Sequence, residues 1–193
     1  LKAFGSPYPV SAVFAFLLIF LTFVVAYKLT DKKSAAALAV LFVILDPLTA
    51  ESVYNVYLDL GQTVFALAFV YSFLFKPKNF ILQGILFGLL LSSKFWSTSL
   101  FLLLGLLIYK IFFLKDFNFK KFAASFGISA LVYAASYAIF FIKGGGLVDF
   151  ILLQIKMLKF MLDHNSGAVL GGQFLLFLTG FYKSWWGRKK KKK

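Results

Sequence analysis

Cysteine is absent from the 193 residues of this chain, and histidine occurs once, as His164. Without cysteine the chain has no disulfide framework, no thiolate metal site and no cysteine nucleophile. A single histidine cannot build a His-rich metal centre, and the seven acidic residues are too scattered to suggest a carboxylate cage. We therefore expect no metal and no other cofactor.

Charged residues are also scarce, at 15% of the chain, whereas 61% of residues are hydrophobic and 20% are aromatic. A soluble domain is roughly 45–50% apolar and has polar residues to cover its surface. Here most of the charges are lysines in short clusters between long apolar runs. The composition therefore predicts an all-α integral membrane protein whose apolar runs face lipid.

The net charge of +14 is concentrated at the ends of the apolar runs and in the terminal stretch Arg188–Lys193. Lysines at such positions set membrane orientation and contact anionic lipid headgroups. A nucleic-acid site needs a basic patch on a water-exposed face. We expect membrane lipids as partners and no nucleic acid.

The apolar runs have the length of membrane helices, about 20 residues for a hydrocarbon layer of about 30 Å. They cover residues 10–27, 34–48, 58–75, 80–91, 95–114, 122–142 and 168–182, of which 80–91 is short for a crossing. The first run lacks a small-residue cleavage site, so we expect no signal peptide. Pro47 should end or kink the second helix. We predict a polytopic transmembrane helical bundle of six or seven membrane helices.

Residues 147–162 carry Asp149, Gln154, Lys156 and Lys159 at spacings that leave a polar stripe on a helix. That pattern is typical of an amphipathic helix in the interface plane. A mildly polar crossing helix inside the bundle is the alternative. The predicted organisation is a helical bundle over residues 1–143, an interfacial helix and loop over 144–167, and a last apolar helix with a basic tail over 168–193.

Lysines alternate between the two sides of the predicted membrane protein. The loops at 28–33, 76–79 and 110–121 hold nine lysines, whereas the lysines on the other side are balanced by acidic residues. Because cytoplasmic loops retain an excess of Lys and Arg, we predict an extracytoplasmic amino terminus and a cytoplasmic carboxy terminus.

Three polar residues are candidates for binding a substrate or a lipid phosphate: Asp59, Lys94 and His164. Asp59 opens an apolar helix near Asp46 and Glu51, where it either shapes a site or favours the positive end of the helix dipole. Lys94 stands between two apolar runs, where its ammonium binds a lipid phosphate or pairs with a carboxylate. His164 lies in a turn-like string, where it contacts substrate or is simply solvated.

The stretch Ile-Leu-Asp-Pro-Leu-Thr-Ala-Glu-Ser-Val-Tyr-Asn-Val-Tyr-Leu-Asp at residues 44–59 resembles the protein O-mannosyltransferase and aminoarabinose-transferase branch of the GT-C glycosyltransferases. In that branch an acidic residue after a short loop opens a membrane helix. Residues 84–96 are similar to the family's glycine-spaced helix, which ends in a lysine and an aromatic residue. Residues 161–164 and 184–186 resemble its His and Ser-Trp elements, at a different spacing.

The resemblance covers roughly residues 8–164 and implies a polyprenyl-phosphate sugar donor, with inverting transfer on the extracytoplasmic face. It implies that Asp59 helps to shape the site and that Lys94 faces the lipid phosphate. The family's catalytic acidic pair lies in a first extracytoplasmic loop that corresponds to a region before Leu1. General-base catalysis needs such a carboxylate, so the resemblance implies a membrane core that lacks the base.

Two other function classes stay open. A non-catalytic subunit of a larger membrane complex fits the small size and the few polar sites. A transporter or channel places ionisable groups near the middle of several helices, and here the helix centres are nearly all apolar.

Overall fold

A computed structural model describes residues 8–54, 58–93, 96–115 and 117–164, and all regular secondary structure in these ranges is helical. The chain divides into two compact units, Leu1–Ile139 (unit 1) and Phe140–Lys193 (unit 2). The helices are α1 (Tyr8–Thr30), α2 (Lys33–Leu45), α3 (Pro47–Tyr54), α4 (Leu58–Phe75), α5 (Phe80–Ser93), α6 (Trp96–Tyr109), the π-helical turn η2 (Lys110–Leu114), α7 (Phe119–Ser136), α8 (Ala138–Ile142) and α9 (Leu147–His164). The predicted all-α class is confirmed.

One described helix is both long and apolar enough to cross a bilayer, the segment Pro9–Thr30 of α1. An apolar helix so near the start of the sequence fits either a membrane span or a signal sequence. The pair α2 and α3 passes the same test together but is bent by 59° at the break between them. The other apolar stretches that stand out are shorter, at Asp59–Phe75, Phe80–Ser93 and Ser99–Leu114. The lengths thus establish one or two candidate spans, fewer than the six or seven predicted.

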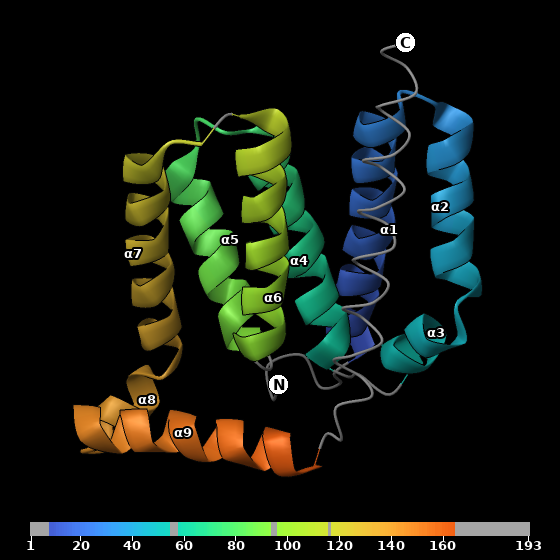
Figure 1. The fold of residues 1–193 in the computed structure, drawn as a ribbon. Coiled ribbons are helices and arrows are strands. Elements are labelled where there is room, and N and C mark those ends of the chain that lie inside the picture. The colour runs from blue at the N-terminus through green and yellow to red at the C-terminus, as the bar shows by residue number, and fades with distance from the viewer. Residues whose placement is uncertain (1–7, 55–57, 94–95, 116, 165–193) are drawn as a thin grey trace. The chain divides into compact units, whose positions relative to one another are not determined.

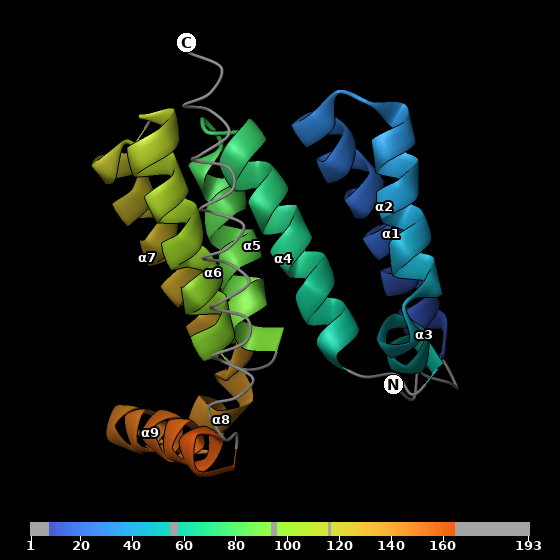
Figure 2. The ribbon, with the colours of Figure 1, turned by 45° about the vertical axis from the view of Figure 1, so that its right-hand side comes forward.

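Helix α5 is the centre of unit 1, where it packs against α4, α6 and α7. Helix α1 packs on α4 and on α2 (Figures 1 and 2). A cluster of buried side chains joins the helices around α5 and consists of Phe69, Phe73, Phe87, Leu90 and Leu103. A second cluster, Leu18, Leu60 and Val64, holds α1 against α4.

Unit 1 buries several polar side chains and exposes many large apolar ones. Ser72 and Ser129 are completely or almost completely buried, with 0% and 1% of their surface exposed, and Ser99 and Gln83 are also buried. Large apolar side chains lie on the outside, and examples are Phe16 at 68%, Phe42 at 66% and Leu131 at 72% exposed. The outer surface is therefore strongly apolar, and the interior carries hydroxyl groups.

The closest packing in unit 1 is the seam between α5 and α7. A Cβ at Gly84 would lie 2.6 Å from the carbonyl oxygen of Ser125, and a Cβ at Gly88 would lie 2.6 Å from the Cβ of Val132. The Ser129 hydroxyl lies 3.0 Å from the Gly84 carbonyl oxygen and 2.9 Å from that of Ser125, and donates to them. Small residues four apart that let two backbones approach, with a serine bonding across, are typical of helix pairs in membranes.

Short polar residues begin three of the helices. The side chains of Asp46, Asn79 and Asn118 accept hydrogen bonds from the backbone N–H groups of Thr49, Leu82 and Lys121, three residues later. Such N-caps satisfy amides that have no partner inside the helix. The Asp46 carboxylate also accepts the Thr49 hydroxyl at 2.6 Å.

The break predicted at Pro47 is confirmed, because α2 ends at Leu45 and α3 starts at the proline. The stretch after it, between the runs predicted at 34–48 and 58–75, forms the short helix α3. Pro47 occupies the first helical position, where its fixed φ fits the helix and its missing N–H leaves no bond unmade. Asp46 and Pro47 together therefore end α2 and also start α3, with Asp46 as the N-cap.

One other boundary differs from the prediction, and one agrees with it. The run 122–142 was expected as one continuous helix, and it is interrupted at Tyr137, whose N–H bonds back to Ala134. The Ser136 hydroxyl donates to the Tyr133 carbonyl at 2.6 Å, and such back-bonding competes with the helical pattern. The apolar run predicted over residues 95–114 ends at Leu114 as expected, through the π-helical turn η2.

In unit 2, α9 follows a turn in which Gly144 has a φ of +91°, a conformation that favours glycine. The Asp149 carboxylate, in the first turn of α9, accepts the Gly146 N–H at 3.1 Å. Apolar side chains at helical spacing are exposed on one face of α9, and these are Val148, Ile151, Leu152 and Ile155. The predicted interfacial segment is thus an amphipathic helix, and the predicted helix 168–182 lies outside the described residues.

Candidate functional site

The lysine-rich links of unit 1 lie together at one end. The connections from α1 to α2, from α4 to α5 and from η2 to α7 all lie at the top of the unit in Figure 1. Their exposed lysines are Lys28, Lys32, Lys33, Lys76, Lys78, Lys115, Lys120 and Lys121. We call this surface the basic end.

Three acidic residues of unit 1, Asp46, Glu51 and Asp59, lie at the opposite end. Asp46 caps α3, Glu51 is exposed on α3, and Asp59 lies half-buried in the first turn of α4. Helix α3 and the start of α4 are both at the end away from the basic links (Figure 2). The Thr49 hydroxyl and amide lower the pKa of the Asp46 carboxyl, so this group stays ionised in ordinary buffers.

The structure describes the three predicted site residues to different extents. Asp59 is placed as described, and its backbone carbonyl accepts the Thr63 hydroxyl at 2.9 Å. Lys94 lies outside the described residues. His164 is the last residue of α9 in unit 2, and its side chain lies outside the described part. No site that joins the three residues follows from this, and their predicted binding roles stay predictions.

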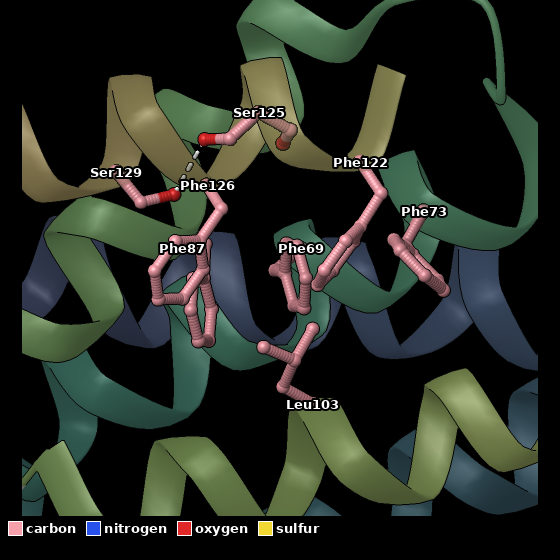
Figure 3. A pocket seen from close by; sticks show the side chains of 8 residues that line it. All are labelled: Phe69, Phe73, Phe87, Leu103, Phe122, Ser125, Phe126 and Ser129. Carbon is pink, nitrogen blue, oxygen red and sulfur yellow. Dashed lines mark hydrogen bonds between the residues drawn. The ribbon is translucent and has the colours of Figure 1, made fainter. Parts of the chain in front are cut away.

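A small cavity lies between α4, α5, α6 and α7. It is lined by Phe69, Phe73, Phe87, Leu103, Phe122, Ser125, Phe126 and Ser129, and its aromatic rings and two serines are seen in Figure 3. Its volume is about 10 Å³, which is the room of one water molecule. The cavity as it stands cannot hold a sugar or a lipid headgroup.

Lys110 is the polar residue that the sequence placed wrongly. It was assigned to an exposed loop, but only 7% of its surface is exposed. Its ammonium donates to the carbonyl oxygen of Phe73 at 3.2 Å and lies 4.5 Å from the centroid of the Phe73 ring. Phe73 is in the last turn of α4, where carbonyl groups lack helical partners and a cation is favoured.

A second side chain satisfies the same helix end. Gln83 of α5 donates from Nε2 to the carbonyl oxygens of Ser72 at 3.3 Å and Lys76 at 2.9 Å. The signal that could have identified both residues is their setting, since each is a lone polar residue inside an apolar run. At membrane depth such residues are expected to face the protein interior.

No metal centre is found in the described part of the chain, where no three side chains of His, Asp or Glu come together. The arrangement there provides a basic end, an end with three carboxylates and a tightly packed interior with buried hydroxyls. It provides charge and shape for binding at the two ends and little space between them.

Comparison with known proteins adds no assignment. No protein family matches the chain, and neither curated proteins nor solved structures contain a significant match.

Proposed function

We propose that this chain is a multi-pass integral membrane protein that forms the membrane core of a glycosyltransferase using a polyprenyl-phosphate-linked sugar. One observation supports the membrane part above all. Many phenylalanine and leucine side chains are exposed on the outside of the bundle, while Ser72, Ser99 and Ser129 are buried beside its apolar core. A soluble protein rarely exposes continuous apolar surface, because water disfavours it, whereas lipid tails solvate it.

Helix lengths set how the bundle fits a bilayer. At 1.5 Å per residue, the 18 residues of α4 extend over about 27 Å and the 14 residues of α5 over about 21 Å. The hydrocarbon layer is about 30 Å thick, and lysines at helix ends, local thinning and neighbouring helices accommodate shorter spans. Helix α5 has neighbours on three sides, so little of it requires contact with lipid.

The charge distribution supports an orientation. We assign the basic end to the cytoplasm, since Lys and Arg are retained there, and the end with Asp46, Glu51 and Asp59 to the extracytoplasmic side. The amino terminus is then outside and the carboxy terminus inside. The exposed apolar face of α9, next to Lys156 and Lys159, supports a place for this helix in the interface plane.

This membrane location is tested with the chain expressed in cells and isolated membranes washed at alkaline pH. We expect the protein to stay in the pellet and to float with reconstituted vesicles. A chain that is released by the wash and folds without detergent contradicts the proposal.

The transferase function is supported by the resemblance at residues 44–59 and 84–96 and by the position of Asp59. This carboxylate opens α4 at the end proposed to face the site of transfer. There it would orient the acceptor or the sugar by accepting hydrogen bonds from hydroxyl groups, and Lys94 would pair with the donor phosphate. The base that deprotonates the acceptor is not assigned to any residue of this chain.

Transfer from a labelled polyprenyl-phosphate sugar, measured with the full-length gene product, tests these roles. We expect Asp59→Asn and Lys94→Ala each to reduce transfer by about tenfold or more, as loss of a charge-assisted hydrogen bond does. Glu51→Gln and Lys78→Ala are matched controls, because both side chains are exposed and stand outside the proposed roles. Unchanged transfer by both test variants contradicts the transferase assignment.

A non-catalytic subunit of a larger membrane complex is the second candidate, and the few charged residues together with the many exposed apolar side chains favour it. The cavity between α4, α5, α6 and α7, at about 10 Å³, has the room of one water molecule and is itself no substrate site. Purification in a mild detergent separates the two cases. Partners at fixed stoichiometry support the subunit, and an active or monodisperse lone chain contradicts it.

A further inference from the structure

The basic end carries a strong excess of positive charge. Its eight exposed lysines belong to three links, and Asp31 is the one acidic residue of these links that the structure describes. Within the described ranges no carboxylate pairs with any of the eight lysines. Their ammonium groups are therefore accessible to solvent and to anionic ligands.

Large apolar side chains stand directly beside these lysines. Phe112 and Phe119 are each 71% exposed on the two sides of the link that holds Lys115 and Lys120, and Leu29 is exposed next to Lys28. Alternating cations with exposed Phe and Leu do not suit a water-facing surface or a protein ion-pair network. They suit the boundary of a bilayer, where apolar groups enter the acyl region and the ammonium groups reach the headgroup phosphates.

Lys110 provides an internal contrast. It comes from the same stretch of sequence, but its ammonium is held by the Phe73 carbonyl and ring. The chain thus has two classes of lysine at this end, one buried and bonded to α4, and eight whose charges point outward.

We infer that the basic end is a binding surface for anionic phospholipid headgroups, with the link from η2 to α7 as its centre. The inference rests on the membrane location proposed above and adds a lipid preference to it. The ligand chemistry is a phosphate diester with net negative charge, which exposed lysines attract and a zwitterionic headgroup satisfies poorly.

The test uses the full chain in nanodiscs of phosphatidylcholine with a minority of phosphatidylglycerol, and counts by mass spectrometry the lipids that remain bound after detergent exchange. One variant carries Lys115→Gln, Lys120→Gln and Lys121→Gln. A matched pair of single variants, Lys120→Gln at the basic end and Lys143→Gln as the control, removes one charge each from an exposed lysine, and Lys143 lies in unit 2 outside α9.

We expect the wild type and the control to enrich phosphatidylglycerol and the first variant to lose that enrichment by about tenfold or more, since each lysine near a membrane surface adds severalfold. The enrichment should also fall steeply at roughly 1 M salt, where the Debye length is about 3 Å. Equal loss in Lys120→Gln and Lys143→Gln shows an effect of net charge and overturns the inference, as does a wild type without enrichment. A chain that does not enter nanodiscs contradicts the membrane location itself, so the two failures are distinct.

Discussion

Replacing Gly84 with alanine tests the seam between α5 and α7. The added Cβ would meet the Ser125 carbonyl oxygen at 2.6 Å and the Ile128 Cβ at 2.7 Å. Ordinary contact begins at about 3.4 Å, so the helices must separate locally by several tenths of an ångström or more. Overpacking of this kind destabilises by about 1–3 kcal/mol.

The separation also weakens the hydrogen bond from Ser129 to the Gly84 carbonyl, now 3.0 Å long. A bond between membrane helices is worth about 0.6 kcal/mol. Alanine favours helix over glycine by up to about 1 kcal/mol, which offsets part of the loss. We therefore expect a net loss of about 1–2 kcal/mol for Gly84→Ala. At roughly 2–4 °C per kcal/mol, the midpoint of thermal unfolding in detergent falls by about 2–8 °C.

Gly127→Ala is the matched control, because a Cβ at Gly127, on α7, has nothing within 4 Å. This substitution should leave the midpoint unchanged or raise it slightly. Ser129→Ala isolates the hydrogen bond and should lower the midpoint by less than Gly84→Ala does. A Gly84→Ala protein as stable as wild type, or a loss equal to that of Gly127→Ala, refutes the close approach of the two helices.

Two further predictions concern single polar groups. Lys110→Met keeps an unbranched side chain of similar length but removes the ammonium that donates to the Phe73 carbonyl. Thermal unfolding should show a loss of stability of about 1–2 kcal/mol. Lys78→Met is the control and should cause no such loss, because Lys78 is exposed. Thr49→Val removes the hydroxyl that lowers the pKa of Asp46, so carboxyl NMR should show this pKa rising toward the ordinary 3.8. A carboxyl group whose pKa is lowered by folding stabilises the folded state at pH values above its ordinary pKa, and this stabilisation is lost as the pH falls through the lowered pKa. The wild type should therefore be more stable than Thr49→Val near neutral pH, and the difference should disappear in acid. An unchanged pKa in the variant contradicts the cap.

Much of the helix pattern could be predicted from the sequence, because apolar runs and breakers are local signals. Residues 58–75 form one helix with the predicted ends, and the break at Pro47 follows from the chemistry of proline. The interruption at Tyr137 could not be predicted from hydropathy, because the sequence is apolar on both sides of it.

Tertiary packing limits the prediction of the site. The spacing of Gly84 and Gly88 was visible in the sequence, but their partner helix starts about 30 residues later and no local rule identifies it. Lys110 was assigned to a loop because lysine usually marks one, and the carbonyl that holds it lies 37 positions away. Of the predicted site residues, Asp59 is at the start of a helix as expected, while its proposed role depends on groups that no sequence pattern brings together.

The close packing between α5 and α7 also has a consequence for the cavity beside these helices. Because α5 and α7 approach closely at Gly84 and Gly88, the two helices cannot slide or separate without losing this contact. Helix α6 has a lighter hold on its neighbours, and it inserts Leu103 into the shared cluster while η2 ties its end to α4 through Lys110. The cavity beside the seam is therefore bounded on one side by this fixed pair, α5 and α7, while α6 contributes the single side chain Leu103 to its lining.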